Sequence, residues 1–409
     1  MNAQATERST GVLVALALSM ALQMTGFVMI LPLFARRFES FGAGVEALSM
    51  SALAYALAST VAAPVVGLLA DRYGRRPIIL LSLSAYTLAF SGYLFATSAW
   101  LIILLRGLAG MFTAGLIPAI TSIVGDLVSE NHRAQWIGIV NGGASVGWII
   151  GPSLGGFLYD QFGYFVPFTA SIAMELVALL LAGSLVPETY SPSLHRGIPR
   201  APGMLGFPKL PSMSTFYLLM LISFGVMFAW AFIEPQFMFY VYDDLSWTSS
   251  RLGLVMSIYG LACMLGEFAL GQLSDRLGRK PVLLLGLTLF SSQFIGLVIF
   301  RDATWIMVSF VLAGLGNALY DPALSAHLLD ITPSEHTARI MGFKAMAGSV
   351  GNMLGPGLVV LFTPFVTPQV IFMIASALVW VLVFTSAFAM RVPSRDEVRD
   401  DFSSAAVSR

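Results

Sequence analysis

Long apolar runs alternate with short polar breaks along the whole chain. A membrane-spanning helix requires about 20 mostly apolar residues, and the sequence contains twelve runs of that kind. The first run is long, follows a single basic residue, Arg8, and contains Pro32 near its end, so we expect a retained helix and not a cleaved signal. The pattern predicts an all-α membrane protein with twelve transmembrane helices, over residues 11–34, 48–70, 77–96, 99–125, 134–158, 163–186, 215–241, 250–272, 281–300, 304–328, 338–362 and 367–390.

Composition excludes most other classes of protein. Hydrophobic residues make up 57% of the chain, charged residues 11%, and the mean hydropathy is +0.82, whereas soluble domains are about 25% charged. The formal net charge is zero, so no overall field favours nucleic acid, and we expect no nucleic-acid partner.

The chemistry-bearing residues do not form an enzyme site. The single cysteine, Cys263, lies in an apolar run, and the four histidines show no metal-ligand spacing. No nucleophile, base and orienting residue can be placed together, and no phosphate-binding GxxxxGK[ST] loop is present in the sequence. We therefore expect no enzymatic activity, no cofactor, no metal site and no direct use of ATP.

Basic residues in the breaks predict the orientation in the membrane, because they remain on the cytoplasmic side. With the N-terminus inside, seventeen of the 22 fall in inner segments, Lys344 among them, four fall in outer segments, and Arg106 alone lies well within a span. Both termini are predicted to be cytoplasmic.

The longest polar interruption, residues 187–214, is rich in proline and suits an extended linker. It separates a predicted N-terminal six-helix bundle, 1–186, from a C-terminal one, 215–390, which a charged cytoplasmic tail follows at 391–409.

The two halves are related by a constant offset of 204 residues. Matched Asp, Pro and His residues in a fixed register are not expected by chance between apolar sequences. Six spans per half make the repeat parallel, so substrate should bind between the halves near the midplane. The matched pairs include Asp71 with Asp275, Arg75 with Arg279, Asp126 with Asp330, Gly151 with Gly355 and Pro152 with Pro356.

Two equivalent loops, residues 67–76 and 271–280, carry the most specific motif. Both resemble the signature loop of the major facilitator superfamily, and the resemblance covers nearly the whole chain. It implies a cytoplasmic latch in which Asp71, Arg75 and Asp126 act against the start of span eleven. The alternative is a solvated turn whose arginines only set topology. The candidate latch residues are Gly67, Asp71, Arg72, Gly74, Arg75, Arg76, Asp126, Asp275, Arg276 and Arg279.

Arg106 lies within span four, where a guanidinium is costly and usually faces the bundle interior. Its surroundings resemble the family's fourth-helix motif, which implies proton coupling, although Ala109 replaces the usual glutamine. The alternative is an arginine that extends to the outer surface.

Small residues at every fourth position on span five predict a ridge for close helix packing. Together with the following proline, the ridge is similar to the antiporter motif of the family's drug/proton antiporters. The first span, with Gln23 before Pro32, resembles that of tetracycline-type exporters, although Gln23 stands where many of them have a carboxylate. Span eleven keeps Gly351, Gly355 and Pro356 but has Val359 and Val360 in place of the last two glycines. A general packing ridge is the alternative. The motif residues are Gly143, Gly147, Gly151, Pro152, Gly155 and Gly156.

Four carboxylates within spans are candidate proton carriers, because burial raises a carboxyl pKa toward the working pH. We rank Asp321 first, then Glu234, Glu267 and Glu175, with Arg106 as a partner in coupling. Aromatic and polar residues on the predicted cavity-lining helices are candidate substrate contacts: Gln23, Asn317, Tyr320, Phe228 and Trp230.

The sequence thus predicts a monomeric secondary transporter in a bacterial inner membrane that moves a small molecule in exchange for protons. We favour efflux of amphipathic or lipophilic compounds by alternating access. An importer of an organic solute and a lipid or glycolipid flippase remain alternatives.

Overall fold

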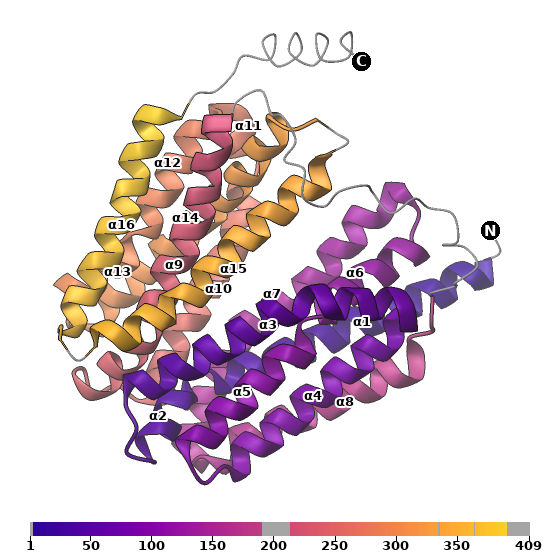
Figure 1. Ribbon diagram of the computed structural model, residues 1–409, viewed down its shortest axis with the longest axis horizontal. Coiled ribbons are helices and arrows are strands. Elements are labelled where there is room, and N and C mark those ends of the chain that lie inside the picture. Colours follow the sequence, from indigo (N-terminus) through magenta and orange to yellow (C-terminus); the bar gives the residue numbers. More distant parts are fainter. Residues whose placement is uncertain (1–2, 190–212, 334–335, 364, 391–409) are drawn as a thin grey trace. The chain divides into compact units, whose positions relative to one another are not determined.

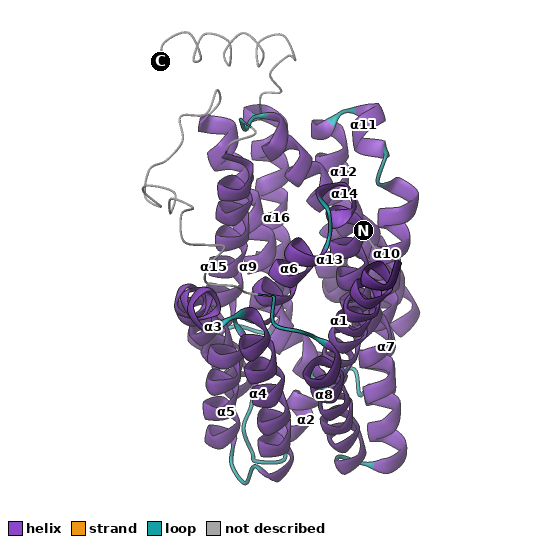
Figure 2. Ribbon diagram, turned by 90° about the vertical axis from the view of Figure 1, so that its right-hand side faces the viewer, coloured by secondary structure: helices purple, strands orange, loops and turns teal. Residues whose placement is uncertain are grey.

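The computed structural model describes residues 3–189, 213–333, 336–363 and 365–390. These residues form sixteen helices and, within the described ranges, no strand (Figures 1 and 2). Twelve stretches are long and apolar enough to cross a membrane. The prediction of an all-α protein with twelve spans is therefore confirmed.

Two spans of the first half are interrupted near glycine or proline. The first span breaks at Pro32, and the fourth breaks before Gly115. The helices are α1 (Ala3–Ile30), α2 (Leu33–Glu39), α3 (Val45–Tyr73), α4 (Arg75–Phe95), α5 (Ala99–Thr113), α6 (Leu116–Leu127), α7 (Glu130–Phe162) and α8 (Phe165–Leu185).

The second half repeats this order with different breaks. Pro235, Pro322 and Pro356 lie inside continuous helices, and the ninth span is divided at Ser291. The helices are α9 (Met213–Asp243), α10 (Ser249–Leu270), α11 (Leu273–Leu277), α12 (Arg279–Phe290), α13 (Ser292–Ile299), α14 (Ala303–Asp330), α15 (Thr337–Phe362) and α16 (Pro368–Ala389).

The chain divides into two compact units. The first comprises the described residues of Met1–Pro199 together with Phe237–Ser257, and the second those of Arg200–Gln236 and Ile258–Arg409. The last turns of α9 and the first turns of α10 therefore belong to the first unit. The rest of both helices belongs to the second.

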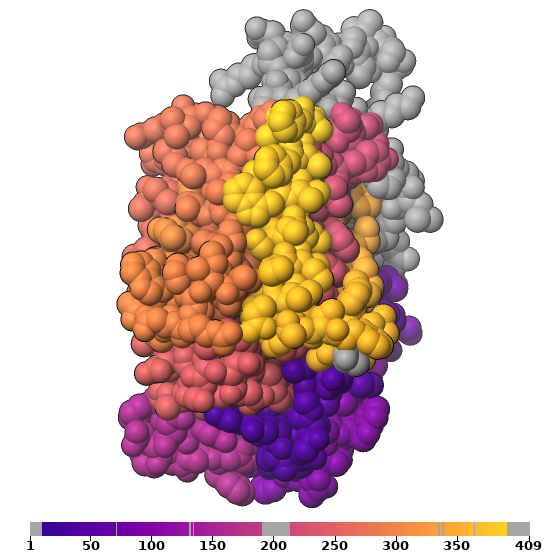
Figure 3. Space-filling model, turned by 90° about the vertical axis from the view of Figure 1, so that its left-hand side faces the viewer, coloured from indigo at the N-terminus to yellow at the C-terminus, as the bar shows by residue number. Residues whose placement is uncertain are grey.

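In the first unit, α1 packs against α7 and α8, α3 packs against α5, and α4 packs against α8. In the second unit, α14 packs against α12, and α16 packs against α12 and α13. Figure 3 shows α16 (yellow) on the surface of the second unit. Its exposed side chains, Met373, Val381, Phe384 and Phe388 among them, are apolar, as a lipid-facing helix requires.

Candidate functional site

The first signature loop turns at Gly74 and begins α4 with a charged cluster. Gly74 has φ +102°, a conformation that residues with a Cβ rarely adopt. Arg75 forms an ion pair with Asp126 of α6. The Glu188 carboxylate accepts hydrogen bonds from the backbone N–H groups of Arg75 (3.2 Å) and Arg76 (3.1 Å), where the dipole of α4 favours negative charge. The Thr189 hydroxyl donates to Asp126 at 2.7 Å.

The second copy of the loop repeats this geometry in the second unit. Gly278 has φ +91°. The Arg279 guanidinium pairs with Asp330 at 2.9 Å and with Asp275 at 2.5 Å. Because Arg279 and Asp330 are the repeat equivalents of Arg75 and Asp126, each unit carries its own arginine–aspartate pair beside a left-handed glycine.

The remaining arginines of the two loops make separate contacts outside the arginine–aspartate pairs. The Arg76 guanidinium donates to the Gly183 carbonyl at 2.6 Å, Arg72 lies 5.3 Å from the Tyr73 ring, and Arg276 donates to Gln272. A Cβ at Gly67 would meet no atom within 4 Å, so close helix approach does not require that glycine. The side chain of Asp71 lies outside the part of the chain whose side chains are described. Glu188 and Thr189, which the sequence analysis left in the linker, belong to this cluster.

The glycine ridge of α7 packs against the backbone of α1. A Cβ at Gly143 would lie 2.6 Å from the Ala17 carbonyl oxygen, and one at Gly147 would lie 2.6 Å from the Met24 Cβ. Gly151 faces Thr25 and Met29 in the same way, and a Cβ at Gly155 would overlap the Met29 carbonyl. The ridge therefore permits an approach that any side chain would prevent.

The same contact recurs in the second unit, where α15 packs against α9. A Cβ at Gly351 would overlap the Phe224 carbonyl, and one at Gly355 would lie 2.7 Å from the Phe232 nitrogen. The packing ridge is thus a property of both repeats, although the full motif stands only in the first.

This contact predicts opposite effects for the same substitution at two positions of α7. Gly147→Ala is expected to destabilise the protein by about 1–3 kcal/mol through overpacking. Gly142→Ala is the matched control, because its Cβ meets nothing within 4 Å and alanine favours helix. Thermal unfolding of the purified variants measures both. Equal stabilities would show that α1 and α7 are not held this closely.

The end of the ridge contacts the first turn of α10, which the sequence analysis did not anticipate. A Cβ at Gly156 would overlap the Ser249 backbone, and one at Gly253 would overlap the Pro152 carbonyl. The Ser153 N–H donates to the Ser257 hydroxyl at 3.1 Å. Gly156 and the Pro152 carbonyl therefore pack against α10.

Asp160, one turn further along α7, caps the start of α10. Its carboxylate accepts hydrogen bonds from the backbone N–H groups of Ser249 (3.1 Å) and Ser250 (2.7 Å) and from the Ser250 hydroxyl (2.5 Å). The first turn of a helix leaves such N–H groups without partners, and a carboxylate there is stabilised by the helix dipole. A polar pocket of about 710 Å³ lies beside it, lined among others by Arg36, Glu39 and Trp247.

Arg106 is buried within the first unit, with 5% of its surface exposed. Its guanidinium carbon lies 4.8 Å from the centre of the Phe34 ring and 5.3 Å from that of Tyr55. Both rings can stabilise the cation through their π faces. The arginine does not extend to the surface, which was the alternative from sequence.

Polar groups continue from Arg106 through the interior of this unit. The Tyr55 hydroxyl lies 2.9 Å from the Tyr86 hydroxyl and 3.4 Å from that of Thr113. Gln23 of α1 and Glu175 of α8 are also buried in this unit, and their polar side-chain atoms have no hydrogen-bond partner among the described residues.

Gln23 and Glu175 occupy the same level of two packed helices. The Ser19 hydroxyl donates to the Ala178 carbonyl at 3.3 Å, and the Ser171 hydroxyl donates to the Gly26 carbonyl at 2.9 Å. Gln23 lies between Ser19 and Gly26 on α1, and Glu175 lies between Ser171 and Ala178 on α8. A carboxyl group without a partner is costly to bury, which sets Glu175 apart from the packed apolar residues around it.

Asp321 lies about two-thirds of the way along α14 and forms an ion pair that sequence reasoning missed. Its carboxylate accepts a hydrogen bond from the Lys344 ammonium of α15 at 2.6 Å. Lys344 had been counted with the cytoplasmic loop residues, but it lies seven residues into α15. Arg106 is thus not the only basic residue well within a span.

The other candidate carboxylates are distributed over two helices. Glu267 is exposed near the end of α10, and Glu234 is half-buried in α9 next to Pro235. The Asn317 amide of α14 donates to the Cys263 sulfur of α10 at 3.5 Å. Asp321 and Glu267 each lie four residues, about one helical turn, after these two residues. Since α10 and α14 cross the membrane in the same direction, Glu267 lies level with Asp321.

The candidate substrate contacts differ in their accessibility. Trp230 stacks on Tyr259 with ring centres 6.2 Å apart, and Trp230 and Asn317 are half-buried. Phe228 stacks between Phe224 and Phe232, whereas Tyr320 packs on Phe290 with 2% of its surface exposed.

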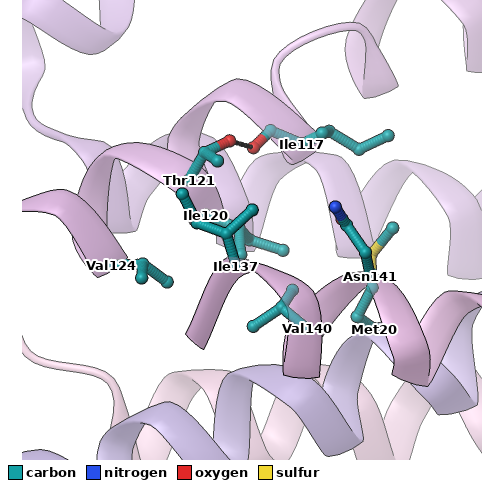
Figure 4. Close-up of a pocket in the computed structure, with 8 residues that line it drawn as sticks. All are labelled: Met20, Ile117, Ile120, Thr121, Val124, Ile137, Val140 and Asn141. Carbon is teal, nitrogen blue, oxygen red and sulfur yellow. Dashed lines mark hydrogen bonds between the residues drawn. The ribbon is translucent and has the colours of Figure 1, made fainter. Parts of the chain in front are cut away.

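A small apolar pocket lies among α1, α6 and α7 (Figure 4). Its volume is about 10 Å³, room for about one water molecule, and Met20, Ile120 and Val124 are among the residues that line it. The Thr121 hydroxyl is bonded to the Ile117 carbonyl of its own helix. This pocket is too small to hold an organic cargo.

Comparison with known proteins places this architecture in a family. The model of the Major Facilitator Superfamily matches residues 16–211 and 218–407. The chain belongs to this superfamily of membrane transporters.

The relatives include drug exporters. The chain is 28% identical over 330 residues, 80% of this chain and 81% of the relative, to the "Multi-drug resistance efflux pump PmrA homolog" of Lactococcus lactis subsp. lactis (strain IL1403). It is 28% identical over 312 residues, 74% of this chain and 77% of the relative, to the "Tetracycline resistance protein, class G" of Vibrio anguillarum.

Solved structures share the fold at lower identity. The human organic anion transporter MFSD10 (TETRAN) superposes with a TM-score of 0.68 at 20% identity, over 92% of this chain and 99% of that one. A bacterial homolog of the human lysosomal transporter Spinster superposes with a TM-score of 0.70 at 18% identity, over 94% and 98%.

Proposed function

We propose that the protein exports small amphipathic or lipophilic compounds in exchange for protons, by alternating access. The observation that carries the proposal is the Asp321 carboxylate. It lies nine residues before the end of α14, about 14 Å along the helix axis. A titratable group at that depth is costly, so its presence in a transporter favours a role in transport.

Export is supported by the relatives and by the glycine ridge. Two relatives bear the names of an efflux pump and a tetracycline resistance protein. The ridge of α7 packs on α1 through Gly147, Gly151 and Gly155, and its end packs on the first turns of α10 through Pro152 and Gly156. A helix so tightly packed on both sides is suited to transmit rearrangement between them.

The proposal assigns roles to the remaining residues. Asp321 carries the proton, Glu234 is the next candidate, and Arg106, Glu267 and Glu175 modulate coupling. The Arg75–Asp126 and Arg279–Asp330 pairs act as latches on the cytoplasmic side. The bundles 1–186 and 215–390 move as bodies joined by the linker 187–214, in a monomer whose two termini, the tail 391–409 included, are cytoplasmic in a bacterial inner membrane.

The direction of transport in everted membrane vesicles tests this function. The lumen of such vesicles corresponds to the cell exterior, so an exporter that exchanges cargo for protons accumulates tetracycline or a neutral fluorescent amphiphile when the lumen is acidified. An importer coupled to protons would expel these compounds instead. Transport that depends on lipid and not on the pH gradient would indicate a flippase.

A further inference from the structure

The Asp321–Lys344 pair joins two helices of the second unit within the membrane. The Lys344 ammonium lies 2.6 Å from the Asp321 carboxylate and 2.6 Å from the Ser325 hydroxyl. An ammonium has three donors, so two are used within the protein. The pair is therefore a built contact with a defined geometry.

The two partners differ in exposure. The Lys344 side chain is 16% exposed, whereas that of Asp321 is 48% exposed. A half-exposed carboxylate more than two turns inside a span faces water or a water-filled cavity, because lipid would not tolerate it. The Lys344 ammonium is thus the more buried partner, and the Asp321 carboxylate is the one that faces water.

The pairing changes the charge that an incoming compound meets. Without Lys344, Asp321 and Glu267 would present two carboxylates at one level of α14 and α10. With Lys344, the charge of Asp321 is cancelled and one carboxylate remains. A monocation could bind Asp321 only by displacing a tethered ammonium, whose effective concentration is high, and that ammonium would then lack its partner.

We propose that Lys344 is the resident counter-ion of Asp321 and sets the charge preference of the cargo site. With Lys344 in place, the site favours neutral and zwitterionic amphipathic compounds more, and permanent monocations less, than Asp321 and Glu267 alone would. This inference rests on the proposed function in one respect, namely that Asp321 lines the cargo site.

The test uses two ions of the same shape and opposite charge, tetraphenylphosphonium and tetraphenylborate. Their affinities for the purified full-length protein are measured at fixed ionic strength, and the ratio of the two affinities is compared among variants. Lys344→Gln removes one positive charge, Asp321→Asn removes one negative charge, and the double variant removes both.

Lys344→Gln should raise the ratio of cation to anion affinity at least tenfold, and Asp321→Asn should lower it at least tenfold. The double variant should return close to the wild-type ratio, as should Lys344→Arg, which keeps the charge. Lys280→Gln is the matched control, because the Lys280 ammonium of the same unit binds the Met390 carbonyl at the helix ends.

A ratio that is unchanged in Lys344→Gln would overturn the proposal, since a lysine needed only for packing would alter both affinities together. If Lys344→Gln does not fold, the proposal is tested by the other two variants: the affinity ratio should fall in Asp321→Asn and return close to the wild-type value in the double variant. The measurement needs no gradient, so it is independent of proton coupling. Failure of the wild type to exchange cargo for protons would refute the proposed function and leave this comparison intact.

Discussion

Asp321→Asn is expected to reduce pH-gradient-driven accumulation of cargo to the level of protein-free vesicles. Asparagine has nearly the same size as aspartate but does not titrate, so no proton can be exchanged for cargo at this position. Binding of a neutral cargo and its exchange between the two sides of the membrane should persist, because neither step requires net proton movement. Accumulation and exchange in proteoliposomes of the same preparation separate the two effects.

The control is the same substitution on the same helix. Asp302 caps α14 through a hydrogen bond from the Thr304 N–H at 2.9 Å, and asparagine caps a helix about as well as aspartate. Asp302→Asn should therefore transport normally. Full accumulation by Asp321→Asn would eliminate Asp321 as the carrier and make Glu234 the first candidate.

Asp160→Ala is expected to open the contact between α7 and the start of α10. The substitution removes the acceptor of two backbone hydrogen bonds and one from a hydroxyl. Loss of such a cap costs about 1–2 kcal/mol, which changes an equilibrium by a factor of roughly 5–30. In a Cys263→Ser background, a cysteine at buried Ser257 should react correspondingly faster with a thiol reagent.

Asp244→Ala provides the comparison for this experiment. Asp244 is an exposed carboxylate between α9 and α10, so its removal alters the charge of the same region without removing the cap. Equal labelling rates in the parent and in Asp160→Ala would show that the carboxylate does not hold the two helices together.

Much of the fold could be predicted because it follows from local composition and from the internal repeat. Membrane spans require long apolar runs, which are visible in any sequence. The repeat aligned Arg279 and Asp330 with Arg75 and Asp126, and the structure forms an arginine–aspartate pair at both places. The two turning glycines, Gly74 and Gly278, also share a left-handed conformation.

The residues that were missed depend on contacts between helices. Lys344 was assigned to a loop because basic residues near a helix end usually mark the cytoplasmic side. The sequence could nevertheless have indicated that Lys344 lies near Asp321, because the two residues are at similar distances from the same predicted membrane face. A lysine more than one turn inside a span opposite an aspartate at equal depth is the signal that was overlooked.

Asp160 had no comparable signal. It caps a helix that begins 89 residues later in the chain, and capping patterns in sequence detect only local partners. Gln23 and Glu175 were recognised separately as polar residues within spans. Only the packing of α1 against α8 places them at one level.

The central claim, exchange of cargo for protons, is tested most directly by the reverse of the driven experiment. Everted vesicles are prepared without a pH gradient, with the membrane potential clamped by potassium and valinomycin, and a cargo without a titrating group is added outside. Inward movement of cargo should make the lumen alkaline in the wild type and leave its pH unchanged in Asp321→Asn. Cargo entry into wild-type vesicles with no change of lumenal pH, or with acidification, would contradict the account.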